Sequence, residues 1–455
     1  MKLNIIILAA GQGTRMKSSL PKVLHPIGGK PMVAHVIDSA KILTAKKIIV
    51  VYGHGGELLR STINDDSLTW VEQKEQLGTG HAVQQTADHF DDDAIVLVLY
   101  GDVPLITPQT LTFLFEAAKD DSLAILTMHV DNPTGYGRIV RDKNSNVLAI
   151  TEEKDATEKE KLITEVNTGF LAVRGKLLRH WLSQLQNTNA QGEFYLTDII
   201  SIAVNEKTTI HSVQAETEDE VLGVNSKVQL AYLERCYQQR QCDALMHNGV
   251  TLIDPKRVDI RGFLSTGKDV TIDINVIIEG DVSLGDNVSI GANCVIKNSK
   301  IGNDVAILPM CHIEDSIVGN DSRVGPYSRL RPGAELKGNN HIGNFVEVKN
   351  SVVDVNSKVN HLTYIGDTDM GSGVNIGAGT ITANYDGANK HRTTIGDNAS
   401  TGSNSVLVAP VVVGDGATIG AGTVLTKNAP EGELTLARST QKLISGWKRP
   451  VKKNK

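Results

Sequence analysis

Aliphatic residues recur at every sixth position through much of the second half of this chain of 455 residues. The series runs from Ile272 to Ile296, resumes from Val318 to Val348 and returns from Leu407 to Leu425. A six-residue period fits neither the 3.6-residue repeat of a helix nor the two-residue repeat of a strand. Three hexads that close one triangular coil explain it, because each coil then presents one aliphatic side chain per side to a continuous interior. The pattern predicts a parallel β-helix rather than a Gly-rich antiparallel sandwich, whose hairpins would not hold this register.

A change in residue pattern and composition divides the chain into two domains and a joining segment. Residues 1–227 mix helical and strand patterns, whereas residues 249–455 consist of hexads rich in Val, Ile, Gly, Asn and Asp. Residues 228–248 contain neither proline nor glycine before Gly249 and keep a helical spacing of apolar residues, which predicts a linker helix. We therefore expect an α/β domain, a linker helix and a β-helix domain.

The overall composition limits the binding partners and the cellular compartment that we expect. A formal net charge of -6 at pH 7 makes nucleic acid an unexpected partner. The four cysteines have neither CxxC spacing nor the density of a secreted scaffold, which indicates a reducing compartment, the cytoplasm by default. The apolar run from Ile5 to Ala10 is too short to cross a membrane, so it reads as a buried strand and we expect no membrane span.

Two strand ends in the first domain carry candidate ligand-binding residues. The run from Ile5 to Ala10 leads into the loop 11–16, Gly-Gln-Gly-Thr-Arg-Met, where glycines would let backbone N–H groups approach a phosphate. Met16 replaces the third glycine of a dinucleotide fingerprint, so the loop alone leaves an ordinary structural turn open. A second apolar run, residues 94–100, ends at Gly101 and Asp102. A carboxylate there is well placed to hold Mg²⁺, or else it caps the next turn.

The hexad register predicts a second site, on the β-helix. Arg331 and Lys349 follow equivalent aliphatics one coil apart, so they stack on one face, as a phosphate site or as two solvated cations. If residues 383–394 are ejected as a loop, His361 is followed in its column by three small residues, Ala378, Ser403 and Ala421. The column makes a groove beside a histidine that could take the proton lost when an amine attacks a thioester. The alternative is a surface histidine beside a flexible loop.

The string from Leu8 to Lys22 resembles the signature of sugar-1-phosphate nucleotidyltransferases, with Gln12 as an uncommon residue in its glycine loop. Such enzymes join a sugar phosphate to the α-phosphorus of a nucleoside triphosphate and release pyrophosphate. The resemblance implies that cations around the triphosphate, Arg15 and Lys22, carry the chemistry, and that Asp102 and Asn225 hold Mg²⁺, with Mn²⁺ able to satisfy the same oxygen ligands. The remaining nucleotide- and sugar-binding residues that it implies are Leu8, Ala9, Ala10, Gly11, Gln73, Gly78, Thr79, Tyr100, Gly101, Gly137, Glu152 and Asn167.

The whole chain is similar to the bacterial family of bifunctional UDP-N-acetylglucosamine pyrophosphorylase/glucosamine-1-phosphate N-acetyltransferases. The strings 328–333, 343–349, 360–367 and 375–387 carry this likeness. It implies a Rossmann-like uridyltransferase domain followed by a left-handed β-helix, with His361 as general base. Substrate contacts are implied for Arg331, Lys349, Tyr364 and Asn375, and acetyl-CoA contacts for Ala378, Asn384, Tyr385, Ser403, Ala421 and Arg438.

The same likeness implies an order of reactions and an assembly. Glucosamine-1-phosphate is acetylated by acetyl-CoA, and the N-acetylglucosamine-1-phosphate formed is coupled to UTP to give UDP-N-acetylglucosamine for cell-envelope polysaccharides. Members of the hexapeptide class are commonly homotrimers, so we expect a trimer. Two rival interpretations stay open from the residues alone. In one the β-helix only oligomerises or regulates a nucleotidyltransferase, and in the other the chain is a nucleotide-binding scaffold without chemistry.

Overall fold

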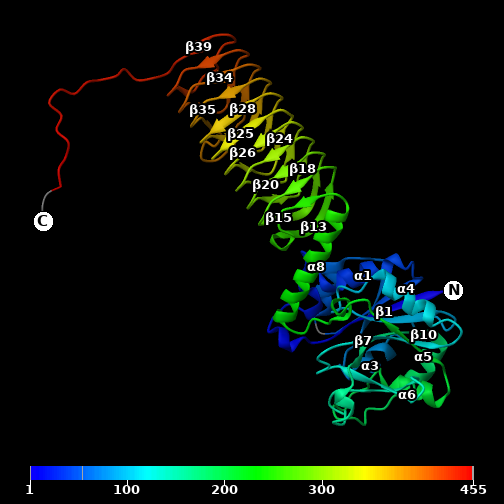
Figure 1. Ribbon diagram of the computed structural model, residues 1–455. Helices are drawn as coiled ribbons and strands as arrows, with labels where there is room; N and C mark the ends of the chain where they lie inside the picture. Colours follow the sequence, from blue (N-terminus) through cyan, green and yellow to red (C-terminus); the bar gives the residue numbers. More distant parts are fainter. Residues whose placement is uncertain (1, 54, 453–455) are drawn as a thin grey trace. The chain divides into compact units, whose positions relative to one another are not determined.

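The computed structural model describes residues 2–53 and 55–452. The chain forms two compact units, Met1–Tyr237 and Gln238–Lys455, each drawn in its own colour range in Figure 1. One helix, α8 (Lys227–His247), runs through the division and contributes residues to both units.

A mixed sheet forms the centre of the first unit. Strands β6, β1, β4 and β5 are parallel to one another, whereas β10 runs antiparallel to both β6 and β7. An antiparallel pair, β8 and β9, extends from β10. The sheet order is β11 (Ile210–Gln214), β7 (Leu123–His129), β10 (Glu165–Arg174), β6 (Ile95–Tyr100), β1 (Leu3–Ala9), β4 (Lys47–Tyr52) and β5 (Leu68–Glu72), with β8 (Gly137–Arg141) and β9 (Val147–Thr151) off this path.

Helices cover both faces of this sheet, so its central strands are apolar on both sides. In β1, Ile5 and Ile7 pack with α1 and α4 in one core, whereas Ile6 and Leu8 pack with α3, α5 and α6 in another. Burial on both faces is why the strand reads as a continuous apolar run instead of an alternating one. The helices are α1 (Met32–Ile42), α2 (Gly56–Ile63), α3 (Thr79–Gln84), α4 (Pro108–Ala117), α5 (Gly175–Leu182), α6 (Asp198–Asn205) and α7 (Glu218–Val221).

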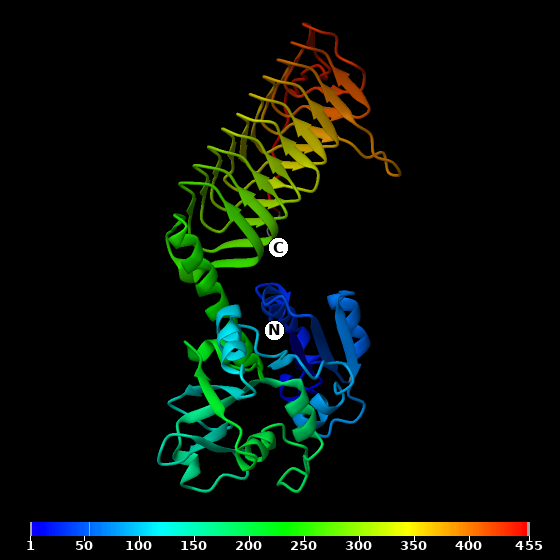
Figure 2. The ribbon, with the colours of Figure 1, turned by 90° about the vertical axis from the view of Figure 1, so that its right-hand side faces the viewer.

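The second unit is a column of stacked coils with short parallel strands, as Figures 1 and 2 show. The hexad aliphatics lie inside: Ile278, Leu330 and Leu407 are fully buried. This confirms the predicted parallel β-helix. One sheet runs from β12 (Thr251–Leu252) to β39 (Leu434–Thr435) and includes β22 (Arg323–Val324), β25 (His341–Asn344), β28 (Lys358–His361), β31 (Asn375–Ile376) and β34 (Ser400–Thr401). The longer sheet runs from β13 (Val258–Thr266) to β38 (Val424–Leu425) and includes β17 (Val295–Lys297), β23 (Arg329–Leu330), β26 (Glu347–Lys349), β29 (Tyr364–Gly366), β32 (Ile381–Ala383), β33 (Thr393–Ile395) and β35 (Val406–Val408).

The corners of the coils need left-handed backbone, and four of them are unusual. Asn, Asp and Gly tolerate positive φ, and from Val258 to Gly432 the other described residues with positive φ are all large and apolar: Met310, Tyr327, Phe345 and Leu362. We call these four the apolar corner column, because they occupy the same corner of successive coils. Their exposed fractions are 44%, 52%, 55% and 63%, and the rings of Tyr327 and Phe345 stack with centroids 5.4 Å apart.

The predicted interruption of the hexads is present. Strand β32 ends at Ala383 and β33 begins at Thr393, so the segment between them leaves the stack as a loop. Tyr385 and Lys390 pair within it as an isolated antiparallel bridge. Across the described residues, none of the helices is both long enough and apolar enough to span a lipid bilayer.

Candidate active sites

The first candidate site lies at one edge of the mixed sheet. Because β1, β4, β5 and β6 are parallel, their carboxyl ends meet there. A cavity of about 490 Å³ opens at this edge. Ten residues expected from the sequence line it, namely Leu8, Ala9, Ala10, Gly11, Lys22, Gln73, Gly78, Thr79, Tyr100 and Asp102. Gly101 lies directly behind this wall and donates its N–H to the Leu8 carbonyl at 2.9 Å.

Lys22 joins the two oxygen ligands expected for Mg²⁺. Its ammonium donates to Asp102 Oδ2 and, at 3.2 Å, to Asn225 Oδ1. Two side-chain oxygens from distant parts of the chain therefore converge on one cation. That donor set fits a hard divalent cation, which keeps several waters and takes only one or two protein oxygens. The described residues contain no cluster of three or more His, Cys, Asp or Glu side chains that could hold a metal ion.

Gln73 and the turn at Gly78 are held rigidly. The Gln73 amide is buried and donates to the Gly78 carbonyl and toward His81 Nδ1, both at 3.1 Å. Gly78 has a φ of 110°, and a Cβ there would lie 2.6 Å from the Phe194 carbonyl oxygen. Thr79 Oγ1 accepts from the Leu196 N–H at 3.1 Å. Hydrogen bonds from Gln73 and Leu196 therefore hold this turn in one conformation.

The residues expected at the sugar are brought together around Glu152. Asn167 on β10 pairs in register with Gly137 on β8. A Cβ at Gly137 would lie 2.9 Å from Ile150 Cγ2 and 3.5 Å from both Glu152 carboxylate oxygens, so this glycine lies next to the carboxylate. Thr197 Oγ1 donates to Glu152 at 3.0 Å. Burial, reinforced by Asp198 and Asp155, raises the pKa of Glu152.

Tyr100 lies near both Glu152 and Thr79. Its side chain is half-buried, and a Cβ at Gly169 would lie 2.5 Å from its ring. Burial raises the pKa of Tyr100, and the nearby carboxylates of Glu152 and Asp102 raise it further. The phenol thus stays neutral and can donate a hydrogen bond.

Arg15 does not join the other predicted residues. It lies exposed in a short 3-10 helix, Thr14–Met16, outside the residues that line the cavity. The preceding residue, Gly13, is left-handed, and a Cβ there would lie 2.6 Å from Lys22 Cβ. The glycine loop therefore places Lys22 in this structure, while Arg15 faces solvent.

The second candidate site lies on the β-helix, and its cation pair differs in detail from the prediction. Register places Arg331 beside Lys349 on the next coil, since the Arg331 N–H donates to the Val348 carbonyl at 2.8 Å. Arg331, however, forms an ion pair with Glu347, with Nη1 and Oε1 2.8 Å apart. Its pKa is raised chiefly by this hydrogen bond. The sequence pattern missed Glu347, although its place two residues before Lys349 on a short strand carries the signal.

Lys349 instead has a second lysine beside it. A hydrogen bond to Lys349, together with its charge, lowers the pKa of Lys390. Lys390 lies in the ejected loop, where no hexad register exists to place it, so sequence reasoning missed it. Two neighbouring lysine side chains, with the Asp367 carboxylate also nearby, favour an anion such as a phosphate.

Tyr364, Asn384 and Asp367 form a polar cluster next to these lysines. Asn384 is buried, and its amide donates to Asp367 Oδ2 and, at 3.4 Å, to the Tyr364 hydroxyl. Asn350 also donates to Asp367. Burial opposes ionisation of Asp367, but these two amide hydrogen bonds and the charge of Lys349 outweigh it and lower the pKa. Asp367, which the sequence analysis did not single out, therefore orients Asn384.

The predicted histidine column is present. The Gly379 N–H donates to the His361 carbonyl at 3.2 Å, Asn404 to Ala378 at 2.7 Å, and Gly422 to Ser403 at 2.8 Å, so successive coils stack along this corner. Ala421 continues the column. The imidazole of His361 is exposed and has no hydrogen-bond partner in the described part of the chain.

Three further predicted residues surround the column. Arg438 Cδ lies 3.8 Å from where a Cβ of Gly422 would be, so this arginine reaches the far end. Asn375 is exposed on β31, paired in register with Lys358 on β28. Tyr385 is 62% exposed, and its hydroxyl donates to the Gly387 carbonyl at 2.6 Å within the loop.

Comparison with known proteins shows the family to which this chain belongs. A family model described as MobA-like NTP transferase domain matches residues 5–166, and the bacterial transferase hexapeptide model (six repeats) matches residues 392–427. A GMPPB C-terminal domain model matches residues 260–336. "Bifunctional protein GlmU" of Azoarcus sp. (strain BH72) is 56% identical over 450 residues, covering 99% of this chain and 100% of that protein. The protein of the same name from Ralstonia nicotianae (strain ATCC BAA-1114 / GMI1000) is 57% identical over 453 residues, covering both chains fully.

This chain belongs to the GlmU family. Its membership confirms the resemblance on which the sequence-based expectations rest, including the prediction of a bifunctional transferase. Solved structures similar to this chain include a crystal structure of UDP-glucose pyrophosphorylase complexed with UDP-glucose (17% identity, TM-score 0.44, covering 53% of this chain and 100% of that one). Another is a putative glucose-1-phosphate thymidylyltransferase from Bacillus anthracis (19% identity, TM-score 0.41, 51% and 94%).

Proposed function

We propose that this member of the GlmU family carries out two successive reactions. Its β-helix unit transfers the acetyl group of acetyl-CoA to the amine of glucosamine-1-phosphate. Its first unit then transfers a uridylyl group from UTP to the N-acetylglucosamine-1-phosphate formed, giving UDP-N-acetylglucosamine and pyrophosphate. The observation that supports this most is full-length similarity to bifunctional relatives combined with two separate polar sites, one in each unit.

Uridylyl transfer needs charge stabilisation more than a base. A phosphate oxygen of the sugar phosphate, already anionic, attacks the α-phosphorus, and the bond from that phosphorus to the bridging oxygen of pyrophosphate breaks. Lys22 provides a positive charge at the floor of the cavity, next to Asp102. Asp102 and Asn225 would hold Mg²⁺, which neutralises phosphate charge when bound. Gln73 and the Gly78 turn would bind uracil, while Gly137, Glu152 and Asn167 would bind the sugar.

Acetyl transfer needs a base, a phosphate anchor and a groove. The glucosamine nitrogen attacks the thioester carbonyl, the carbon–sulfur bond breaks, and His361 takes the proton that the nitrogen loses before the thiolate of CoA leaves. The imidazole is free to do so because none of the described residues hydrogen-bonds to it. Arg331, Lys349 and Lys390 would anchor the sugar phosphate. The small side chains of Ala378, Ser403 and Ala421 leave room along the corner for an extended pantetheine chain.

The apolar corner column supports the expected homotrimer. A large non-Gly residue in left-handed backbone costs about 1 kcal/mol or more, and exposed apolar side chains gain nothing in a monomer. Four consecutive corners combine left-handed backbone with an exposed apolar side chain. The last of them is Leu362, the neighbour of His361. A second copy packed on this column would bury it and would lie beside the general base.

Reciprocal variants test the assignment of reactions to units. Separate assays follow CoA release from acetyl-CoA plus glucosamine-1-phosphate, and pyrophosphate release from UTP plus N-acetylglucosamine-1-phosphate. We expect His361→Ala to lose at least about 10²-fold in CoA release and to keep pyrophosphate release, because a positioned base is worth about that factor. Asp102→Ala should do the reverse. A wild-type protein that releases pyrophosphate but no CoA would show that the β-helix serves only assembly or regulation.

A further inference from the structure

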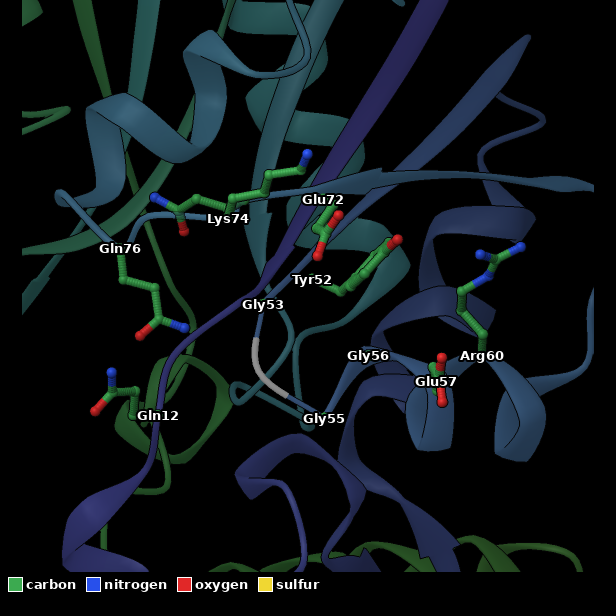
Figure 3. A pocket seen from close by; sticks show the side chains of 11 residues that line it. Gln12, Tyr52, Gly53, Gly55, Gly56, Glu57, Arg60, Glu72, Lys74 and Gln76 are labelled. Atoms are coloured by element: carbon green, nitrogen blue, oxygen red, sulfur yellow. The ribbon is translucent and has the colours of Figure 1, made fainter.

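The nucleotide cavity has a larger neighbour that the expected site residues do not explain. This second cavity, of about 710 Å³, lies against the carboxyl ends of β4 and β5. Three glutamines, Gln12, Gln73 and Gln76, line both cavities. They therefore form the wall between the two spaces. Figure 3 shows the side chains of Gln12 and Gln76 together at one end of the second cavity.

Gln76 is the glutamine that bridges strand ends across this wall. Its amide nitrogen donates to the Ala10 carbonyl at 2.7 Å, which ties the segment after β5 to the end of β1. Gly53, the residue after β4, lies against the same amide. A Cβ built at Gly53 would lie 2.5 Å from Gln76 Nε2 and 2.8 Å from the Ala10 oxygen, so only glycine leaves room for this hydrogen bond. The ends of β1, β4 and β5 thus pack around one amide.

The other two glutamines cannot close the wall by themselves. Gln73 is buried and already committed to Gly78 and His81. Gln12 is exposed and its side chain has no hydrogen bond among the residues that the structure describes. Removal of the Gln76 side chain would therefore join the 490 Å³ and 710 Å³ cavities.

The space beyond the wall is polar and could solvate a larger base. Glu57 and Arg60 on α2, and Glu72 and Lys74 after it in the chain, line the second cavity. None of these four charged side chains has an ion pair or hydrogen bond within the described ranges. Figure 3 shows Glu57 and Arg60 at the end of the cavity opposite Gln12 and Gln76.

We propose that Gln76 sets the size limit of the nucleobase subsite, so that uridine nucleotides fit while purine nucleotides are excluded. The inference rests on the proposed placement of uracil at Gln73 and the Gly78 turn. A pyrimidine base bound there would fill the space up to the wall formed by Gln12, Gln73 and Gln76. A purine carries a second ring, which has no space unless the wall opens into the neighbouring cavity.

The experiment compares pyrophosphate release from UTP and from ATP, each with N-acetylglucosamine-1-phosphate, in the full-length protein. For Gln76→Ala we expect the ratio of kcat/KM for ATP to that for UTP to rise at least about tenfold, mainly through a lower KM for ATP. Gln76→Met fills the same volume without the amide and should keep the ratio within about threefold of wild type. Lys74→Ala is the control, because Lys74 lines only the second cavity. Far-UV circular dichroism and thermal unfolding of each variant report that its first unit is folded, and Gln76→Ser replaces the alanine variant if that one does not fold.

An unchanged ratio in an intact Gln76→Ala or Gln76→Ser protein would overturn the proposal, as would an equal rise in Lys74→Ala. Gln73→Ala separates this failure from a misplaced nucleobase. If Gln73→Ala raises the KM for UTP while Gln76→Ala leaves selectivity unchanged, the base lies at Gln73 and only the size limit is wrong. If Gln73→Ala leaves the KM for UTP unchanged, the placement of uracil itself is wrong.

Discussion

The two units build their sites by different physical routes. In the first unit, Lys22, Asp102 and Asn225 come from three distant stretches of chain, and parallel strands that end at one edge bring them together. In the β-helix, His361, Ala378, Ser403 and Ala421 occupy the same corner of successive coils, which the backbone ladder holds in line. One site depends on topology, and the other depends on register.

This difference determines how a substitution propagates. An edge site relies on contacts such as that between Gly13 and Lys22, where one added methyl group would displace a functional side chain. A register site tolerates change at most corners, because the ladder of backbone hydrogen bonds places each residue regardless of its identity. It becomes sensitive only where residues leave the ladder, as Asn384 and Lys390 do in the loop beside Asp367.

The largest expected effect is at Lys22, the cation of the edge site. Lys22→Ala should lower kcat for pyrophosphate release by about 10²- to 10³-fold, because it removes a preorganised charge from the phosphate site. CoA release should stay unchanged. Lys17→Ala, in the same loop but exposed and away from the cavity, is the matched control. Comparable losses in both variants would indicate a loop defect instead of a lost charge.

The second prediction concerns the apolar corner column. Replacing both Tyr327 and Phe345 by Asn restores the residue type found at neighbouring corners and removes the exposed rings. We expect the monomer to fold as well as before, since Asn tolerates positive φ, while the trimer dissociates and CoA release falls by about 10²-fold through the loss of a shared site. Light scattering gives the assembly state, and pyrophosphate release serves as the internal control. A variant that remains trimeric would assign the interface to another face.

The sequence pattern located some residues of both sites and missed others. The hexad pattern placed His361 beside Ala378, Ser403 and Ala421 because register converts spacing into position. It could not place Lys390 or the Asn384–Asp367 bond, since residues 384–392 leave the stack and have no register. In the first unit the motif string found Lys22 and Asp102 but not Gln76, whose role depends on where the ends of β1 and β4 meet. Arg15 shows the converse, a motif residue that the loop turns toward solvent.

A third, smaller effect is expected at Asp367. Asp367→Asn removes the charged acceptor of Asn350 and Asn384, so CoA release should fall by about tenfold, the value of one charge-assisted hydrogen bond. Asp369→Asn is the control, because its pair with Arg392 is exposed and contributes little to stability.

The contribution of Asp367 to stability depends on pH. The pKa of Asp367 is lowered in the folded protein, so its contribution is complete above the ordinary aspartate pKa of about 3.9 and is lost as the pH falls further. The difference in unfolding free energy between wild type and variant should therefore be constant near neutral pH and shrink below about pH 4, and a difference that grew toward acid pH would contradict the assignment.

The smallest expected effect is at an ordinary corner, Asn298, which has a φ of 44°. Asn298→Ala should cost about 1 kcal/mol in unfolding free energy, because alanine in left-handed backbone brings Cβ too close to the following carbonyl. Asn298→Gly should cost less, since glycine adopts this conformation freely. Urea unfolding of both variants measures the difference, and both assays should keep wild-type rates because the corner touches neither site. If alanine and glycine cost the same, the Asn298 side chain matters through its bond to the Asp281 N–H, at 3.2 Å, and not through its backbone. That result would mean that side-chain bonds between coils, and not register alone, hold the β-helix together.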